Sequence, residues 1–174
     1  QQLDLKQFEP KSMLVVPERK VPRPAFPVID FHGHLCWAAR SAKGVALTGD
    51  RTFLASPDDL LPVMDRKNVR TMVNLTGGYE AGLEDAIAKF DKAKPGRFLT
   101  MTEPAWARIQ EPGYAQKQVE ILERAKKAGA RGLKVLKTLG LYLKDGVTEG
   151  NLIKIDDPRF DPMWDACGKL GLPV

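Results

Sequence analysis

The two histidines of the 174-residue chain, His32 and His34, lie two positions apart inside a short apolar stretch. The apolar residues of this stretch are β-branched or aromatic, which predicts a β-strand. Alternate side chains of a strand share a face, so Asp30, His32 and His34 are expected to point the same way. Ile29 and Phe31 then point to the opposite face. Two neighbouring imidazoles make half of a divalent-metal site, and the carboxylate of Asp30 on their face could orient a ligand, or the wall of the site, by hydrogen bonding.

Two ligands alone do not complete such a site, because a zinc ion takes about four ligands. A single histidine in a strand is more often an ordinary polar residue, but a pair at this spacing after Asp30 favours metal binding. The chain has no third histidine, so the other ligands must be of another type or come from elsewhere. Zinc is the expected cofactor, and manganese or iron would also accept two imidazoles.

The composition describes an ordinary globular protein, with 43% hydrophobic and 28% charged residues. The net charge of +5 is mild and the cations are scattered, which argues against nucleic-acid binding. Cys36 and Cys167 are too far apart for a zinc ribbon, and two cysteines make no disulfide framework. No apolar run approaches the length of a membrane span, so we expect no membrane partner. The chain begins at Gln1; removal of a signal peptide would place it in the periplasm or outside the cell, and otherwise we expect the cytoplasm.

Strand and helix signals alternate along most of the chain. Residues 1–27 are rich in proline and are expected to form an extended lead-in, with the apolar run 13–16 as one edge strand. The later residues predict strands and helices in turn. The strands begin near 28, 69, 97, 131 and 172. The first helix begins at Ser56, with apolar residues as far as Met64, and the later helices cover 80–93, 114–128 and 161–170. Pro62 is expected to shorten or kink the first helix.

This alternation predicts a parallel sheet with helices outside it. No glycine-rich phosphate loop follows the first strand, which argues against a dinucleotide-binding fold. We expect residues 28–174 to be the N-terminal half of a (β/α)8 TIM barrel, which takes about 250 residues, ending as its fifth strand begins.

Active sites of such barrels lie at the C-terminal ends of the strands, where His32 and His34 stand. The other strand ends offer further candidates, namely Asn74 or Thr76, Thr102 or Glu103, and Lys134 or Lys137. Glu103 is a candidate substrate-binding residue. The long connection 35–55 and the hairpin expected over 138–157 follow strands, so both should wall the same site. Arg40 or Lys43 from the first connection could hold a substrate carboxylate.

The stretch Asp30-Phe31-His32-Gly33-His34 resembles the end of the first barrel strand in the amidohydrolase superfamily. Its context, together with residues 129–134 and 168–174, is similar to the amidohydrolase-related branch, which includes aminocarboxymuconate-semialdehyde-decarboxylase-like enzymes. The resemblance covers residues 26–174. It implies a centre of one or two divalent metal ions, with His32 and His34 as ligands.

The same resemblance implies several further residue roles. In some relatives a lysine on the fourth strand is carboxylated and bridges two metals; Lys134 is the nearer match and Lys137 the other. The family's later histidines and its aspartate, the usual general base, would lie beyond Val174. The catalytic residues of this chain are therefore unknown, and we expect its 174 residues to be inactive alone. A histidine-bearing strand should begin within about 10 residues after Val174.

The resemblance implies a hydrolase that activates water on the metal and attacks an amide, ester or lactone in a small molecule, with decarboxylation as a variant. One alternative is a PHP-like metal phosphoesterase, which also carries His-x-His on its first strand, although the rest of this chain holds no further histidine. Another is a non-catalytic truncated barrel used for binding. A homo-oligomer is compatible with each of them.

Overall fold

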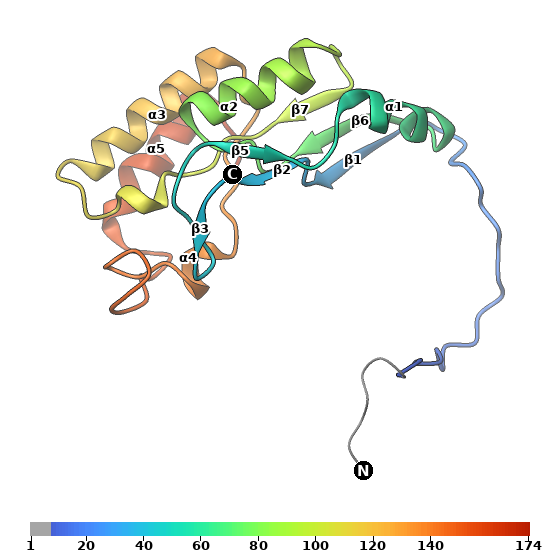
Figure 1. Cartoon of the computed structure of the whole chain (residues 1–174), viewed down its shortest axis with the longest axis horizontal. Helices are drawn as coiled ribbons and strands as arrows, with labels where there is room; N and C mark the ends of the chain where they lie inside the picture. Colours follow the sequence, from blue (N-terminus) through green and yellow to red (C-terminus); the bar gives the residue numbers. More distant parts are fainter. Residues whose placement is uncertain (1–7) are drawn as a thin grey trace.

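A computed structural model of the chain describes residues 8–174. Its centre is a parallel sheet of three strands in the order β1-β6-β7. These strands are β1 (Val28–Gly33), β6 (Val69–Asn74) and β7 (Phe98–Thr100) (Figure 1). The starts predicted near 28, 69 and 97 are therefore confirmed. The protein is a mixed α/β fold. One helical segment lies between β1 and β6 in the chain, and another lies between β6 and β7.

The strand predicted over residues 132–136 is wrong as a regular element. One parallel bridge joins Leu133 to Thr102, and the N–H of Lys134 donates to the carbonyl of Thr102 at 2.8 Å. On the other side the N–H of Leu133 donates to Pro173 at 2.8 Å. Because Pro173 has no N–H to return, no ladder forms there, and the predicted strand near 172 is also not regular. The segment at Leu133 nevertheless lies parallel to the one at Thr102, and Pro173 lies on its other side.

The four predicted helices are confirmed. They are α1 (Pro57–Arg66), α2 (Glu80–Ile87) with its π-helical continuation η1 (Ala88–Lys92), α3 (Tyr114–Ala128) and α5 (Asp161–Leu170). Ser56 and Asp59 form a capping box at the start of α1. Gly129 and Gly171 end α3 and α5 in the left-handed conformation, as αL caps do. The predicted shortening at Pro62 is wrong, because α1 runs past it to Arg66. Pro62 has no N–H, and the carbonyl that this N–H would have bonded lies in the exposed first turn of the helix.

Apolar side chains pack on both faces of the sheet. Under α1 and η1, Met64, Phe90 and Phe98 form a buried cluster. On the opposite face, Val73 and Met101 belong to a second cluster. The largest cluster lies between α3 and α5, which lie side by side in Figure 1, and is centred on the buried ring of Phe160 in the 3-10 helix η3 (Pro158–Phe160).

The connection 35–55, expected to be irregular, contains two small antiparallel pairs. β2 (Cys36–Ala38) pairs with β5 (Arg51–Phe53), and β3 (Ser41–Ala42) pairs with β4 (Val45–Ala46). Lys43 and Gly44 join β3 to β4 with φ angles of 45° and 81°. Positive φ at both central residues is the signature of a type I′ turn, which suits the twist of a tight hairpin.

The hairpin predicted over 138–157 is wrong as a pair of strands. The segment holds the short α4 (Thr138–Leu141) and only isolated antiparallel bridges from Lys144 to Val147 and Leu152. The Asp145 carboxylate accepts the N–H of Asn151 at 3.1 Å. Side-chain and turn hydrogen bonds thus replace a regular ladder there.

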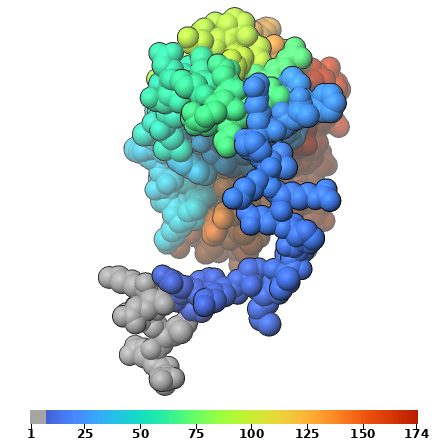
Figure 2. Space-filling view, turned by 90° about the vertical axis from the view of Figure 1, so that its right-hand side faces the viewer, coloured from blue at the N-terminus to red at the C-terminus, as the bar shows by residue number. Residues whose placement is uncertain are grey.

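The lead-in is extended as predicted, but the edge strand expected over 13–16 is wrong. Met13 is 96% exposed, and Figures 1 and 2 show the segment running away from the body. Prolines before and after the run remove backbone donors that a strand would need. The segment contacts the body through Pro24, whose carbonyl accepts the Asn68 amide at 2.9 Å. The first seven residues of the predicted lead-in lie outside the part of the chain that the structure describes. No helix among residues 8–174 is long and apolar enough to span a membrane.

Two glycines inside helices provide a matched test of packing. A Cβ at Gly82 in α2 would overlap the backbone of Gly49, whereas one at Gly168 in α5 meets no atom within 4 Å. We predict that Gly82→Ala lowers the free energy of unfolding by about 2 kcal/mol, because the helix must move away from the loop. Gly168→Ala should raise it by about 0.5 kcal/mol. Urea denaturation of both variants checks this, and equal effects would contradict the close packing.

Candidate functional site

A cavity of about 690 Å³ opens at the C-terminal end of β1. It is surrounded by the segment 134–138, by Gly44 of the β3–β4 turn and by Trp37. Its polar and aromatic lining consists of His32, His34, Trp37, Lys134, Lys137 and Tyr142, together with Thr138. The structure therefore brings the histidine pair and both candidate lysines to one space.

The two imidazoles lie close together in this cavity. Their ring centroids are 5.2 Å apart and their planes meet at 64°. The indole of Trp37 stacks on His34 at 5.2 Å with an angle of 10° between the planes. The Nδ1 atom of His34 is buried and has no hydrogen-bond partner among the described residues. One nitrogen of His34 thus remains uncommitted in a ring whose orientation is fixed by stacking.

Burial lowers the pKa of His34, and the nearby charges of His32 and Lys134 lower it further. A lowered pKa keeps the imidazole neutral at physiological pH. Only a neutral imidazole has a lone pair free for a metal ion. The electrostatic surroundings of His34 therefore favour the form that binds metals.

Asp30, predicted to orient a ligand from the face of the two histidines, lies next to the pair in β1. The register between β1 and β6 shifts between Asp30 and Gly33, so the simple alternation of faces is interrupted there. Asp30 does not line the cavity, and its Oδ1 atom accepts the backbone N–H of His32 at 3.2 Å. Asp30 thus supports the backbone at His32. Ile29 and Phe31, which alternate with Asp30 along β1, are 61% and 68% exposed.

The predicted polar residues at the ends of β6 and β7 mostly bind backbone groups. Asn74 is fully buried, and its Oδ1 atom accepts the N–H of Leu35, directly after His34, at 3.0 Å. Thr102 donates its hydroxyl to the carbonyl of Gly78 at 2.9 Å. The thiol of Cys36 donates to the carbonyl of Thr76 at 2.8 Å, and burial raises its pKa. These side chains fix the loops around the cavity.

A second, inner cavity of about 260 Å³ shares Trp37, Gly44, Leu136 and Thr138 with the first. Glu103 lines it and pairs with Arg51 of β5 at 2.9 Å; the two side chains are 8% and 2% exposed. Burial raises the pKa of Glu103, while Arg51 and the N–H of Gly78 act in the opposite direction. Sequence reasoning did not single out Arg51; a lone cation in an irregular connection gives no signal of burial.

The cations predicted to hold a substrate carboxylate do not line the large cavity. Arg40 is exposed, and Lys43 forms an ion pair with Glu149 of the second connection. Next to Lys43, the carbonyl of Gly44 accepts the hydroxyl of Thr138 at 3.0 Å. The two long connections therefore meet over the cavity and wall it together, as predicted from their position in the chain.

Comparisons with known proteins add no family. No protein-family model matches this chain, and no curated protein matches it. Among residues 8–174, no group of three or more His, Cys, Asp or Glu side chains could hold a metal ion.

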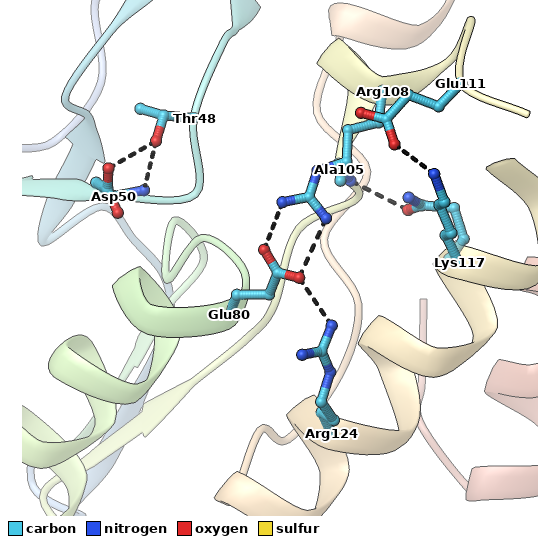
Figure 3. A network of polar contacts seen from close by, with 9 residues as sticks. Thr48, Asp50, Glu80, Ala105, Arg108, Glu111, Lys117 and Arg124 are labelled. Carbon is cyan, nitrogen blue, oxygen red and sulfur yellow. Dashed lines mark hydrogen bonds and ion pairs between the residues drawn. The ribbon is translucent and has the colours of Figure 1, made fainter.

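A separate polar network lies at the start of α2 (Figure 3). The Glu80 carboxylate accepts both terminal nitrogens of Arg108, at 3.1 and 2.6 Å, and one from Arg124 at 2.7 Å. This links α2 to the 3-10 helix η2 (Trp106–Arg108) and to α3. Hydrogen bonds from Arg108, followed by its charge and that of Arg124, lower the pKa of Glu80 despite some burial. Because the Glu80 carboxylate is bound by side chains from two other elements, we interpret this network as structural.

The buried pair allows a test of what Arg51 contributes. We predict that Arg51→Met lowers the free energy of unfolding by about 3 kcal/mol, because Glu103 is left buried without its cation. The pKa of Glu103 then rises further, so the folded state holds a proton that the unfolded chain releases. Stability of this variant must therefore fall with rising pH, and its deficit should be larger at about pH 8 than at about pH 5.

The matched control is the double variant Arg51→Met/Glu103→Leu. It removes both charges, so it should recover most of the stability and lose the added pH dependence. Thermal denaturation across the pH range measures both variants. A deficit in Arg51→Met that is independent of pH would show that lost packing, rather than the unpaired carboxylate, is responsible.

Proposed function

We propose that this chain is part of a metal-dependent hydrolase of the amidohydrolase superfamily. Such an enzyme would hydrolyse an amide, ester or lactone bond of a small molecule. The observation that carries the proposal is the pair His32 and His34 at the C-terminal end of a parallel strand, with His34 Nδ1 buried and without a partner.

The spacing of the two rings fits a shared ion. Imidazoles bound to one tetrahedral zinc ion would have ring centroids about 5 Å apart. The centroids of His32 and His34 are 5.2 Å apart. Zinc is the metal we propose, and manganese or iron would accept the same two ligands. Lys134 lines the same cavity and is the candidate for a carboxylated, bridging lysine, with Lys137 as the weaker alternative.

The order of elements supports a half barrel as the frame of this site. Three parallel strands alternate with helices, and the segments around Leu133 and Pro173 continue the sheet through single bridges and hydrogen bonds. In a barrel of this kind the strand ends gather around one active site.

Each residue of the chain has a limited role in this proposal. The bound metal would lower the pKa of a water molecule and polarise a carbonyl oxygen. His32 and His34 would hold the ion, while Trp37 fixes the ring of His34 by stacking. Asp30 and Asn74 would keep the backbone on either side of His34 in place through their hydrogen bonds to His32 and Leu35.

The alternatives have less support from the site. A phosphoesterase would need a denser set of ligands, and no third His, Cys, Asp or Glu joins the pair among the described residues. A purely binding protein gives no reason for two imidazoles in one cavity. Decarboxylation needs the same metal and stays a variant of the main proposal.

Metal binding by the two histidines is the direct test. We predict that the protein binds Zn²⁺ and Co²⁺, and that His32→Ala and His34→Ala each weaken binding at least about tenfold, because even the loss of an outer partner has effects of this size. Equilibrium dialysis gives the affinity, and visible absorption of Co²⁺ reports on its ligands.

Asp165→Asn is the control, because Asp165 is an exposed carboxylate on α5 that does not line the cavity. It should bind both ions like the parent protein. Unchanged affinity in both histidine variants would sink the metal proposal, whatever the fold of the complete protein.

A further inference from the structure

The charged groups in the large cavity are unbalanced. Within residues 8–174, its charged lining residues are Lys134 and Lys137, and no Asp or Glu lines it. Among residues 8–174, neither lysine takes part in an ion pair, whereas Lys43, Lys94 and Lys117 each pair with a carboxylate. A cavity that collects unpaired cations has a positive potential and attracts anions.

The uncharged walls are flat and apolar. Val135 and Leu136 line the cavity between the two lysines. The ring of Tyr142 lies against Gly44 so closely that a Cβ there would overlap it, and the indole of Trp37 lies on the ring of His34. Apolar walls with a few placed polar groups are typical of sites for small organic molecules.

We propose that this cavity binds a small organic anion with an apolar body, and that Lys137 is the specificity-determining residue that holds the negative charge. That the bound anion is a substrate rests on the proposed hydrolase function. The body of the anion lies against Trp37 and Tyr142. Its reacting bond then lies toward the two histidines.

Lys137 suits this role better than the other cations nearby. Lys134 directly follows the bridge between Thr102 and Leu133, so it lies at the sheet end of the cavity, where the two histidines stand, whereas Lys137 directly precedes α4. Arg51 lies in the inner cavity, where Glu103 at 2.9 Å already balances its charge. Lys137 is exposed and free of an ion pair within the described part of the chain, so its ammonium group is available to an incoming anion.

The test uses two probes of the same shape, benzoate and its neutral analogue benzamide, with the whole chain in the presence of EDTA. Nuclear magnetic resonance titration of the Trp37 indole N–H follows binding. We expect benzoate to bind more tightly than benzamide. Lys137→Gln should weaken benzoate about tenfold, as for the loss of one charged contact, and change benzamide less than about twofold.

Two further variants make the assignment specific. Lys137→Arg keeps the charge and should retain most of the benzoate affinity. Lys169→Gln removes an exposed lysine of α5 outside the cavity and should change nothing. Equal affinities for the two probes would overturn the proposal, and so would unchanged benzoate binding in Lys137→Gln.

The metal and anion proposals fail separately. Because EDTA removes metal ions, benzoate binding does not depend on the histidines holding one. If the parent protein does not prefer benzoate to benzamide but its histidines bind Zn²⁺, only the role of Lys137 is overturned. Intact benzoate selectivity with no contribution of either histidine to Zn²⁺ binding overturns the hydrolase alone.

Discussion

The parallel pairing of β1 with β6 is the constraint on which this structure depends. It is completed at the strand ends by the hydrogen bond from the N–H of Leu75 to the carbonyl of Gly33, at 2.8 Å. Parallel strands need long crossover connections, and these bring every strand's C-terminal end to one edge of the sheet. His32 and His34 therefore meet the segment 134–138, about a hundred residues further along the chain. Without that pairing the cavity would have no second wall.

Much of this frame could be predicted from the sequence, because its signals are local. Apolar periodicity, the Ser56 cap and the glycines after α3 and α5 located the helices, and β-branched runs located β1 and β6. The prediction of a regular strand at Leu133 was wrong, because strand formation depends on the neighbouring segment. Here that segment contains Pro173, which lacks the N–H that a ladder needs. The pairs inside 35–55 were missed because two- and three-residue strands are too short to show a period.

The site was predictable to a similar extent. The histidine pair and the lysines could be located from spacing and from the order of strands, and the structure brings them to one cavity. The hydrogen bond from the His32 N–H to Asp30 could not be predicted from the sequence, because it accompanies a register shift within β1 that no local pattern signals. Arg51 could not either, because its burial depends on meeting Glu103, a residue from another strand end. Asn74 and Thr102 at that edge bind loop backbone, whereas His34 Nδ1 has no partner among the described residues.

The turn at Lys43 and Gly44 also has a consequence for how this fold can diversify. It touches Tyr142, Thr138 and Glu149, so the two connections are shaped against each other rather than independently. A longer or shorter turn in one of them would leave the other without its support. Relatives with a different ligand preference should therefore carry matched changes in both connections, and transplanting a single loop between such proteins should not transfer that preference.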